Sequence, residues 1–182
     1  LSGEPVNIAV GAQQRGGKPC LHVLSTDDSG GTTRLQHVHW AQGREEDTAG
    51  PEFVTDEPVV LPGLKKRRDR TVSSFLIQDL NHDGLNDLFA FFERRPARLY
   101  LRQTGGEAAF VEAGGDSAAQ RGLLEGLTPD RFNTADTDDD GQLELLIARR
   151  GFISSAELTE GGTLQVLDQI NSRRASDDLR LP

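Results

Sequence analysis

The stretch FLIQDLNHDGLNDLFAFF, Phe75–Phe92, determines the interpretation of this chain, because two short apolar runs enclose a loop of oxygen-bearing side chains. Counted from Asp79, acidic or amide residues occupy positions 1, 3, 5 and 9 of the loop, and Gly84 occupies position 6. Alternate residues of a tightly curved loop point inward, and the glycine permits the sharp turn. This pattern predicts a binding site for a hard cation such as calcium, which prefers six to eight oxygen ligands.

The same arrangement returns in FNTADTDDDGQLELLIAR, where Asp136 follows Asp79 by 57 residues. Two loops in one register indicate an internal repeat. Each loop is predicted to bind one calcium ion, so the chain would carry two. The predicted ligands of the first loop are Asp79, Asn81, Asp83, Asp87 and the Leu85 carbonyl; those of the second are Asp136, Asp138, Asp140, Glu144 and the Gln142 carbonyl.

Other metals and the EF-hand fit these loops less well. Magnesium requires a small, rigid octahedron and retains its waters. Soft metals would find no cysteine in the loops and only His82, which falls between ligand positions. An EF-hand needs a bidentate Glu at position 12 and flanking helices, whereas position 12 is Ala90 or Ile147 and the flanks are strand-length apolar runs.

The segments DLNHDGLNDL and DTDDDGQLEL, each followed by strand-like sequence, resemble the calcium loop of the FG-GAP/VCBS repeat. This repeat is the blade unit of integrin-alpha-like β-propellers. The resemblance covers Thr71–Asn171 and extends more weakly to the first forty residues. It implies an all-β fold of antiparallel four-stranded blades, about three in number, within a larger propeller. Members of the family serve adhesion, lectin-like, enzyme-linked and structural roles.

The domain organisation predicted on this basis is a single partial propeller over residues 1–182. It would contain a blade at 1–40, an insert at 41–70, a blade at 71–128 and a blade at 129–182. Apolar and alternating runs predict strands, and a longer insert is expected at Gly151–Gly162. The expected strands are Val6–Val10, Leu21–Ser25, Thr33–Trp40, Ser74–Gln78, Leu88–Phe92, Arg98–Arg102, Ala109–Glu112 and Thr163–Asp168.

The net charge of −9 comes largely from the eight acidic residues of the two loops, so it points to metal sites rather than to a particular partner. Without an ion, two carboxylates about 5 Å apart would repel by roughly 3 kcal/mol at an effective dielectric constant of about 20. No apolar run approaches the roughly 20 residues of a membrane span. Calcium loops of the extracellular type fill where calcium is abundant, which favours an extracytoplasmic location.

Several other groups in the sequence fit simpler roles than catalysis or metal binding. His37 and His39 share a strand face but lack an evident third ligand, and Cys20 with His22 lacks a nucleophile context. Cys20 is the only cysteine, so the chain has no internal disulfide. The basic run Lys65–Arg70 is expected to be a solvated loop rim, since no aromatic residues alternate with it as in a nucleic-acid site. Asp27–Ser29 lacks the loop spacing.

The predicted function is therefore a calcium-stabilised, non-catalytic scaffold or interaction module outside the cytoplasm. Its expected partners are other protein subunits or the rest of a longer chain, not nucleic acid. A rival from another class is a segment of a larger enzyme or redox complex that holds a substrate or partner subunit. Carbohydrate binding by surface loops is a third candidate, with one Trp and one Tyr to support it.

Overall fold

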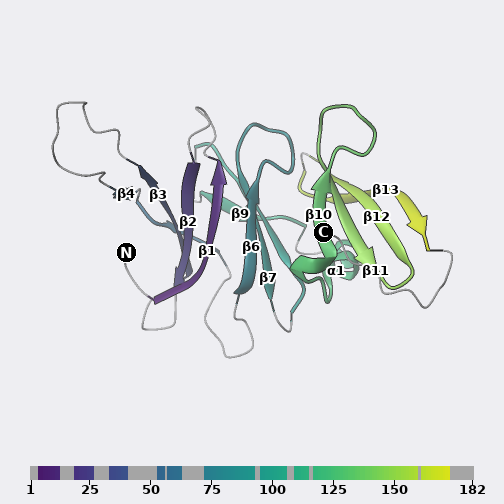
Figure 1. Ribbon diagram of the computed structural model, residues 1–182, viewed down its shortest axis with the longest axis horizontal. Coiled ribbons are helices and arrows are strands. Elements are labelled where there is room, and N and C mark those ends of the chain that lie inside the picture. Colours follow the sequence, from purple (N-terminus) through teal and green to yellow (C-terminus); the bar gives the residue numbers. More distant parts are fainter. Residues whose placement is uncertain are drawn as a thin grey trace. The chain divides into compact units, whose positions relative to one another are not determined.

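The computed structural model describes residues 4–12, 19–26, 33–40, 53–55, 57–62, 72–92, 95–105, 109–114, 117–159 and 161–172. These residues are mostly β-strand, arranged in three antiparallel sheets (Figure 1). The chain divides into two compact units, Leu1–Val72 and Ser73–Pro182. The prediction of an all-β chain built of antiparallel sheets is confirmed, whereas the assembly of these sheets as propeller blades stays a prediction.

The first unit contains the sheet formed by β1 (Glu4–Ala12), β2 (Pro19–Thr26), β3 (Thr33–Trp40) and β4 (Phe53–Thr55), in that order. The short strand β5 (Val59–Val60) also pairs with β3, opposite Arg34 and Leu35. Strands β4 and β5 lie within residues 41–70, so part of this predicted insert extends the sheet. The apolar side chains Val23, Leu24 and Leu35 are buried there.

The second unit begins with the sheet β6 (Val72–Gln78), β7 (Asp87–Phe92), β8 (Arg98–Arg102) and β9 (Phe110–Glu112). Each strand is hydrogen-bonded to the next one along the chain, which makes the sheet a four-stranded meander. Every residue of β7 is buried, so this strand is covered on both faces. That explains its continuous apolar sequence LFAFF, since a strand with one wet face would alternate.

The last sheet repeats this order with β10 (Phe132–Ala135), β11 (Glu144–Arg149), β12 (Phe152–Leu158) and β13 (Leu164–Asn171). The prediction of an insert at Gly151–Gly162 is wrong, because β12 occupies most of it and pairs with both neighbours. Its sequence FISSAEL is weakly apolar, but Ser154 and Ser155 are small enough to be buried between the flanking strands. Packing against these neighbours outweighs the weak strand pattern.

The sheet β6–β9 and the sheet β10–β13 pack together through one hydrophobic core. This core includes Phe89, Phe91 and Leu99 from the first sheet and Phe132, Leu145 and Ile147 from the second. Phe89 and Phe132 stack with their ring centroids 4.6 Å apart, and Phe91 meets both rings edge-on. These aromatic contacts hold the start of β10 against β7.

The connection between the two sheets contains the helix α1 (Ala118–Leu124) and the 3-10 turn Pro129–Arg131. Ser117 caps the helix by accepting a hydrogen bond from the backbone N–H of Gln120. The buried Gln120 amide donates to the Ala113 carbonyl at 3.1 Å and accepts from the Leu164 N–H at 3.1 Å. One side chain therefore joins the end of β9 to the start of β13.

Candidate metal centre

The two acidic loops occupy the same place in the two sheets of the second unit, between the first and second strands. Position 1 of each loop, Asp79 or Asp136, is the residue directly after the first strand. Position 9, Asp87 or Glu144, is the first residue of the second strand. The strands thus hold both ends of each loop, and the residues between them form the curve.

The two loops also share their backbone conformation. Positions 4 and 6 have left-handed φ angles in both, +60° and +82° at His82 and Gly84, and +65° and +87° at Asp139 and Gly141. Gly84 and Gly141 fit this conformation because they lack a Cβ. The left-handed conformation at position 4 was not predicted. His82 and Asp139 are polar residues of the kinds that adopt it more readily than most non-glycine residues.

Three equivalent hydrogen bonds close each loop. The carboxylate at position 1 accepts from the glycine N–H at position 6, at 2.9 Å in both loops. The carboxylate at position 5 accepts from the N–H of position 7, at 2.7 Å for Asp83 and 2.8 Å for Asp140. The carboxylate at position 9 accepts from the N–H of position 2, at 3.0 Å for Asp87 and 2.6 Å for Glu144. The acidic side chains therefore build the turn as well as line it.

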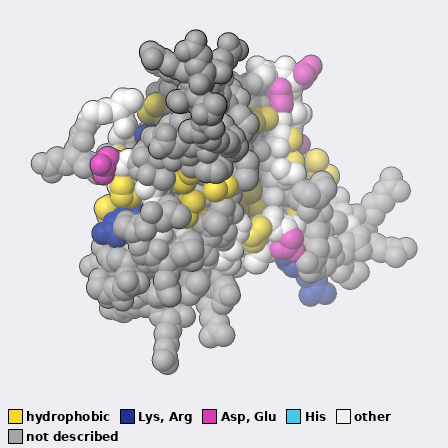
Figure 2. Space-filling model, turned by 60° about the vertical axis from the view of Figure 1, so that its left-hand side comes forward, with side chains coloured by type: hydrophobic (Ala, Val, Ile, Leu, Met, Phe, Trp, Pro, Cys, Tyr) yellow, Lys and Arg dark blue, Asp and Glu magenta, His cyan; other side chains and the backbone are white. Residues whose placement is uncertain are grey.

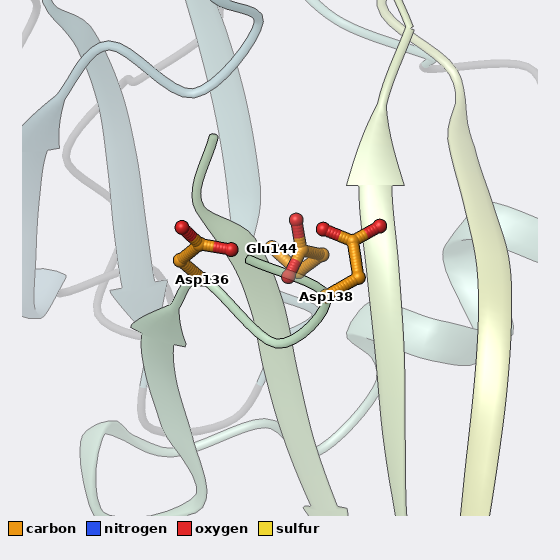
Figure 3. A group of neighbouring side chains, drawn as sticks. All are labelled: Asp136, Asp138 and Glu144. Carbon is orange, nitrogen blue, oxygen red and sulfur yellow. The ribbon is translucent and has the colours of Figure 1, made fainter. Parts of the chain in front are cut away.

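In the second loop, the side chains of Asp136, Asp138 and Glu144 converge, as Figure 3 shows. Each offers one carboxylate oxygen, and these three oxygens lie within 4.8 Å of one another. Oxygens bound at 2.3–2.6 Å to a single calcium ion can be at most about 5 Å apart. The spacing therefore suits one calcium ion held by three side chains from the two ends and the middle of the loop.

Glu144 is the buried member of this group, whereas Asp136 and Asp138 are exposed. Its Oε2 accepts hydrogen bonds of 2.6 Å from both the N–H and the hydroxyl of Thr137. The Thr137 hydroxyl lies 3.3 Å from that of Ser155 on β12. Thr137 was not predicted as part of the site, because position 2 carries Leu80 in the first loop and therefore shows no shared side-chain pattern.

Asp140 does not belong to the convergent group. Its Oδ1 accepts the Gln142 N–H at 2.8 Å, and its Oδ2 accepts the Gln142 side-chain amide at 3.1 Å. The backbone N–H of Asp140 itself lies 3.2 Å from Asp136 Oδ1 and 3.3 Å from Asp138 Oδ1. Asp140 therefore shapes the turn in this structure, and its part as a direct ligand stays a prediction, as does that of the Gln142 carbonyl.

The first loop holds its oxygens differently. The Asn81 amide donates to Asp83 Oδ2 at 3.0 Å and accepts the Asp83 N–H at 3.3 Å, so these two predicted ligands are bonded to each other. Among the described residues, the three carboxylates of this loop do not form a convergent group like that of the second. Asp79 Oδ1 is nevertheless buried without a hydrogen-bond partner. A buried carboxylate oxygen of this kind fits a cation ligand, because burial without compensation is costly.

Asp87 connects the first loop to the neighbouring strand β8. Its Oδ2 accepts from Leu80 N–H, and its Oδ1 accepts from Arg102 N–H at 2.9 Å, at the end of β8. Burial is the main reason that the pKa of Asp87 rises to about 6; the two backbone hydrogen bonds lower it, and the charges of Asp83 and Asp79 raise it further. A bound cation would favour the ionised form of this carboxyl.

The groups for which the sequence favours simpler roles are unequally described. His22 and His37 are buried, and their rings meet edge-on with centroids 4.7 Å apart. For Cys20 and His39 the strand register is described but the side chains are not. The basic run Lys65–Arg70 and Asp27–Ser29 lie outside the described residues. On the face drawn in Figure 2, acidic side chains appear at several separate places among the described atoms.

Within the described ranges, the helices are too short and too polar to cross a membrane. Comparisons of the chain with protein-family models, with curated proteins and with solved structures gave no match.

Proposed function

We propose that the two loops bind calcium and that the ions stabilise a non-catalytic scaffold or interaction module of an extracytoplasmic protein. The observation that carries this proposal is the convergence of three carboxylate oxygens of the second loop within 4.8 Å. The same backbone conformation in the first loop, together with the buried and unpartnered Asp79 Oδ1, supports a second ion there. The FG-GAP/VCBS resemblance remains part of the proposal, with the sheets as blades of a larger β-propeller.

Bound calcium would act as a staple at the bend between the first two strands of each sheet. Its charge offsets the repulsion among the carboxylates, and its coordination ties the end of one strand to the start of the next. Calcium is a weak activator of bound water compared with zinc, and the ligand groups are already used to build the turn. These properties favour a structural role for the ions over a catalytic one.

The edge strand β13 supports a partner surface in the second unit. Its residues after Leu164 are exposed, and they include the large apolar side chains of Val166, Leu167 and Ile170, which are 45%, 45% and 66% exposed. An exposed strand edge with apolar side chains invites pairing with another chain or segment. We therefore assign to this edge the contact with another subunit or with the rest of a longer chain.

Calorimetric calcium titration of the chain and matched variants tests the metal proposal. Wild type should bind two ions, and Asp138→Asn should lose binding at one site because it removes a carboxylate of the convergent group. Asp139→Asn is the control, since it removes an adjacent charge, keeps a residue that tolerates the left-handed conformation and alters no member of that group. Equal losses in the two variants, or no binding by wild type, would refute the proposed sites.

A further inference from the structure

The two loops differ at two of the positions predicted to bind calcium. Position 3 is Asn81 in the first loop and Asp138 in the second, and position 9 is Asp87 in the first and Glu144 in the second. The predicted ligand side chains carry three negative charges in the first loop (Asp79, Asp83, Asp87) and four in the second (Asp136, Asp138, Asp140, Glu144). Proteins set the calcium affinity of such sites by the number of charged ligands and by the rigidity of the site. The charge therefore favours binding at the second loop.

Position 3 makes the same backbone contact in both loops but offers a different second atom. The Asn81 side-chain oxygen accepts the Asp83 N–H at 3.3 Å, and Asp138 Oδ1 accepts the Asp140 N–H at the same distance. The other terminal atom of Asn81 is a nitrogen that donates to Asp83 Oδ2 at 3.0 Å, and an amide nitrogen does not bind cations. The other terminal atom of Asp138 is a second carboxylate oxygen. In the described structure, the second loop thus offers an oxygen at position 3 that takes no part in the turn.

Position 9 differs in the same sense. Asp87 is fully buried, and its two oxygens accept the Leu80 N–H at 3.0 Å and the Arg102 N–H at 2.9 Å. Glu144 makes its described hydrogen bonds through Oε2 alone, both with Thr137. Its side chain is longer than that of Asp87, and its Oε1 remains available to an ion. An ion at the first loop, by contrast, must share or displace a backbone contact of Asp87.

Position 1 is the exception, and positions 3 and 9 outweigh it. Asp79 Oδ1 is buried without a hydrogen-bond partner, whereas Asp136 Oδ1 accepts the Asp140 N–H at 3.2 Å. Position 5 is alike in the two loops, because both oxygens of Asp83 and of Asp140 accept hydrogen bonds. Among the described contacts, the first loop therefore has one ligand oxygen outside the hydrogen bonds of the turn, and the second loop has two together with the additional charge.

We propose that the two calcium sites differ in affinity, so that the second loop fills first and the first loop fills only at a higher calcium concentration. This inference rests on the proposed calcium function and gives each site a role of its own. The second site is a permanent staple of its sheet, because three of its ligands already converge. The first site responds to the calcium concentration, because its ligands must give up contacts that they make with one another and with the backbone.

Filling of the first site should act on the end of β8. The Arg102 N–H that Asp87 accepts belongs to the last residue of this strand. The guanidinium carbon of the same residue lies 5.7 Å from the centre of the Phe110 ring on β9. An ion that takes an oxygen of Asp87 therefore changes the surroundings of the Arg102 backbone. An ion at Glu144 changes contacts with Thr137, which lies inside the second loop.

Calorimetric titration with calcium tests the order of filling through a reciprocal pair of variants. Wild type should bind two ions in two steps whose affinities differ by roughly tenfold or more. Asn81→Asp should tighten only the weaker step, and Asp138→Asn should remove only the tighter step. His82→Asp is the matched control, because it adds the same charge to the first loop at position 4, where the second loop carries Asp139 in the same left-handed conformation. It should change the weaker step less than Asn81→Asp does.

Amide resonances followed by NMR in the same titration assign each step to a loop without any substitution. The Thr137 resonance should shift during the tighter step and the Arg102 resonance during the weaker one. Two ions bound with equal affinity, or an Arg102 shift that accompanies the tighter step, would overturn the proposed difference while leaving calcium binding intact. No binding by wild type would refute the calcium function itself, and this inference with it.

Discussion

Single carboxylates in the loops serve two purposes, since they accept hydrogen bonds from the turn and face the proposed ions. Glu144 shows this most clearly, because its Oε2 accepts two bonds from Thr137 while a carboxylate oxygen of the same residue lies within 4.8 Å of oxygens of Asp136 and Asp138. Hydrogen bonds to one oxygen orient a carboxylate for its metal, as outer-shell partners of metal ligands commonly do.

Loss of the Thr137 hydroxyl should therefore weaken the second calcium site without removing a ligand. We expect Thr137→Val to lower calcium affinity at that site by roughly 10-fold, the lower end of outer-shell effects. Thr104→Val is a suitable control because Thr104 is an exposed threonine that follows β8 in the other sheet. Titration calorimetry measures the calcium affinity of both variants. An unchanged affinity in Thr137→Val would show that Thr137 does not position Glu144.

The raised pKa of Asp87 predicts a pH dependence of the metal-free chain. Its folded pKa of about 6 exceeds the ordinary value of 3.8, so between these pH values the folded state holds a proton that the unfolded state has lost. The free energy of unfolding in chelator should therefore fall as the pH rises from about 4 to about 6. Urea unfolding at several pH values measures this slope.

Asp87→Asn should remove that part of the slope, because an amide does not titrate. Calcium should act in the opposite direction, since it favours the ionised carboxyl, and its affinity for wild type should rise as the pH increases through about 6. The same pH slope in wild type and in Asp87→Asn, both measured in chelator, would show that another group is responsible.

Whole strands and loops show which features a sequence can predict. The strands around the first loop were predictable, because β6 and β7 carry dense apolar runs and the loop has glycine at a fixed position. The glycine positions and the ends of the loops followed from the calcium pattern. The strand β12 was not predictable in the same way, because its serines are buried only through contact with β11 and β13.

The cross-strand neighbours of the first unit could not be predicted from the sequence either. His37 and His39 share a face by spacing alone, but their positions opposite His22 and Cys20 depend on the register of β2 against β3. A shift of one residue in that register would move the partners to opposite faces. Likewise, the spacing predicts both Asp138 and Asp140 as calcium ligands. In the structure the Asp140 carboxylate instead accepts hydrogen bonds from Gln142.

The connection through the buried Gln120 should be sensitive to a single substitution. Gln120→Ala would leave the buried Ala113 carbonyl and Leu164 N–H without this partner, and we expect a loss of roughly 2–4 kcal/mol in the free energy of unfolding. Arg121→Ala on the exposed side of the same helix should change it by less than about 0.5 kcal/mol. Chemical denaturation measures both variants, and similar losses would show that the hydrogen bonds of Gln120 do not supply this stability.

At the scale of the whole chain, both proposed calcium loops belong to the unit Ser73–Pro182. Calcium should consequently stabilise this unit and leave the unit Leu1–Val72 unchanged. The exposed edge strand β13 is the proposed contact surface of the second unit.

That edge predicts concentration-dependent association of the isolated chain. Light scattering should show association that decreases in Leu167→Lys and Ile170→Lys, since a charge on an apolar strand edge opposes pairing. Gln103→Lys adds the same charge at an exposed position before β9 and should leave association unchanged. A wild-type chain that stays monomeric at all concentrations would contradict the assignment of β13 as a contact surface.

The most direct test of the central claim, that calcium staples both loops of the second unit, is hydrogen exchange measured by mass spectrometry with calcium and with chelator. Calcium should slow exchange at residues 79–87 and 136–144 and in the strands β7 and β11 that follow them, because an ion bound to the folded loops opposes local opening. Exchange in β1, β2 and β3 should not change. Equal exchange in calcium and in chelator at both loops would contradict the account.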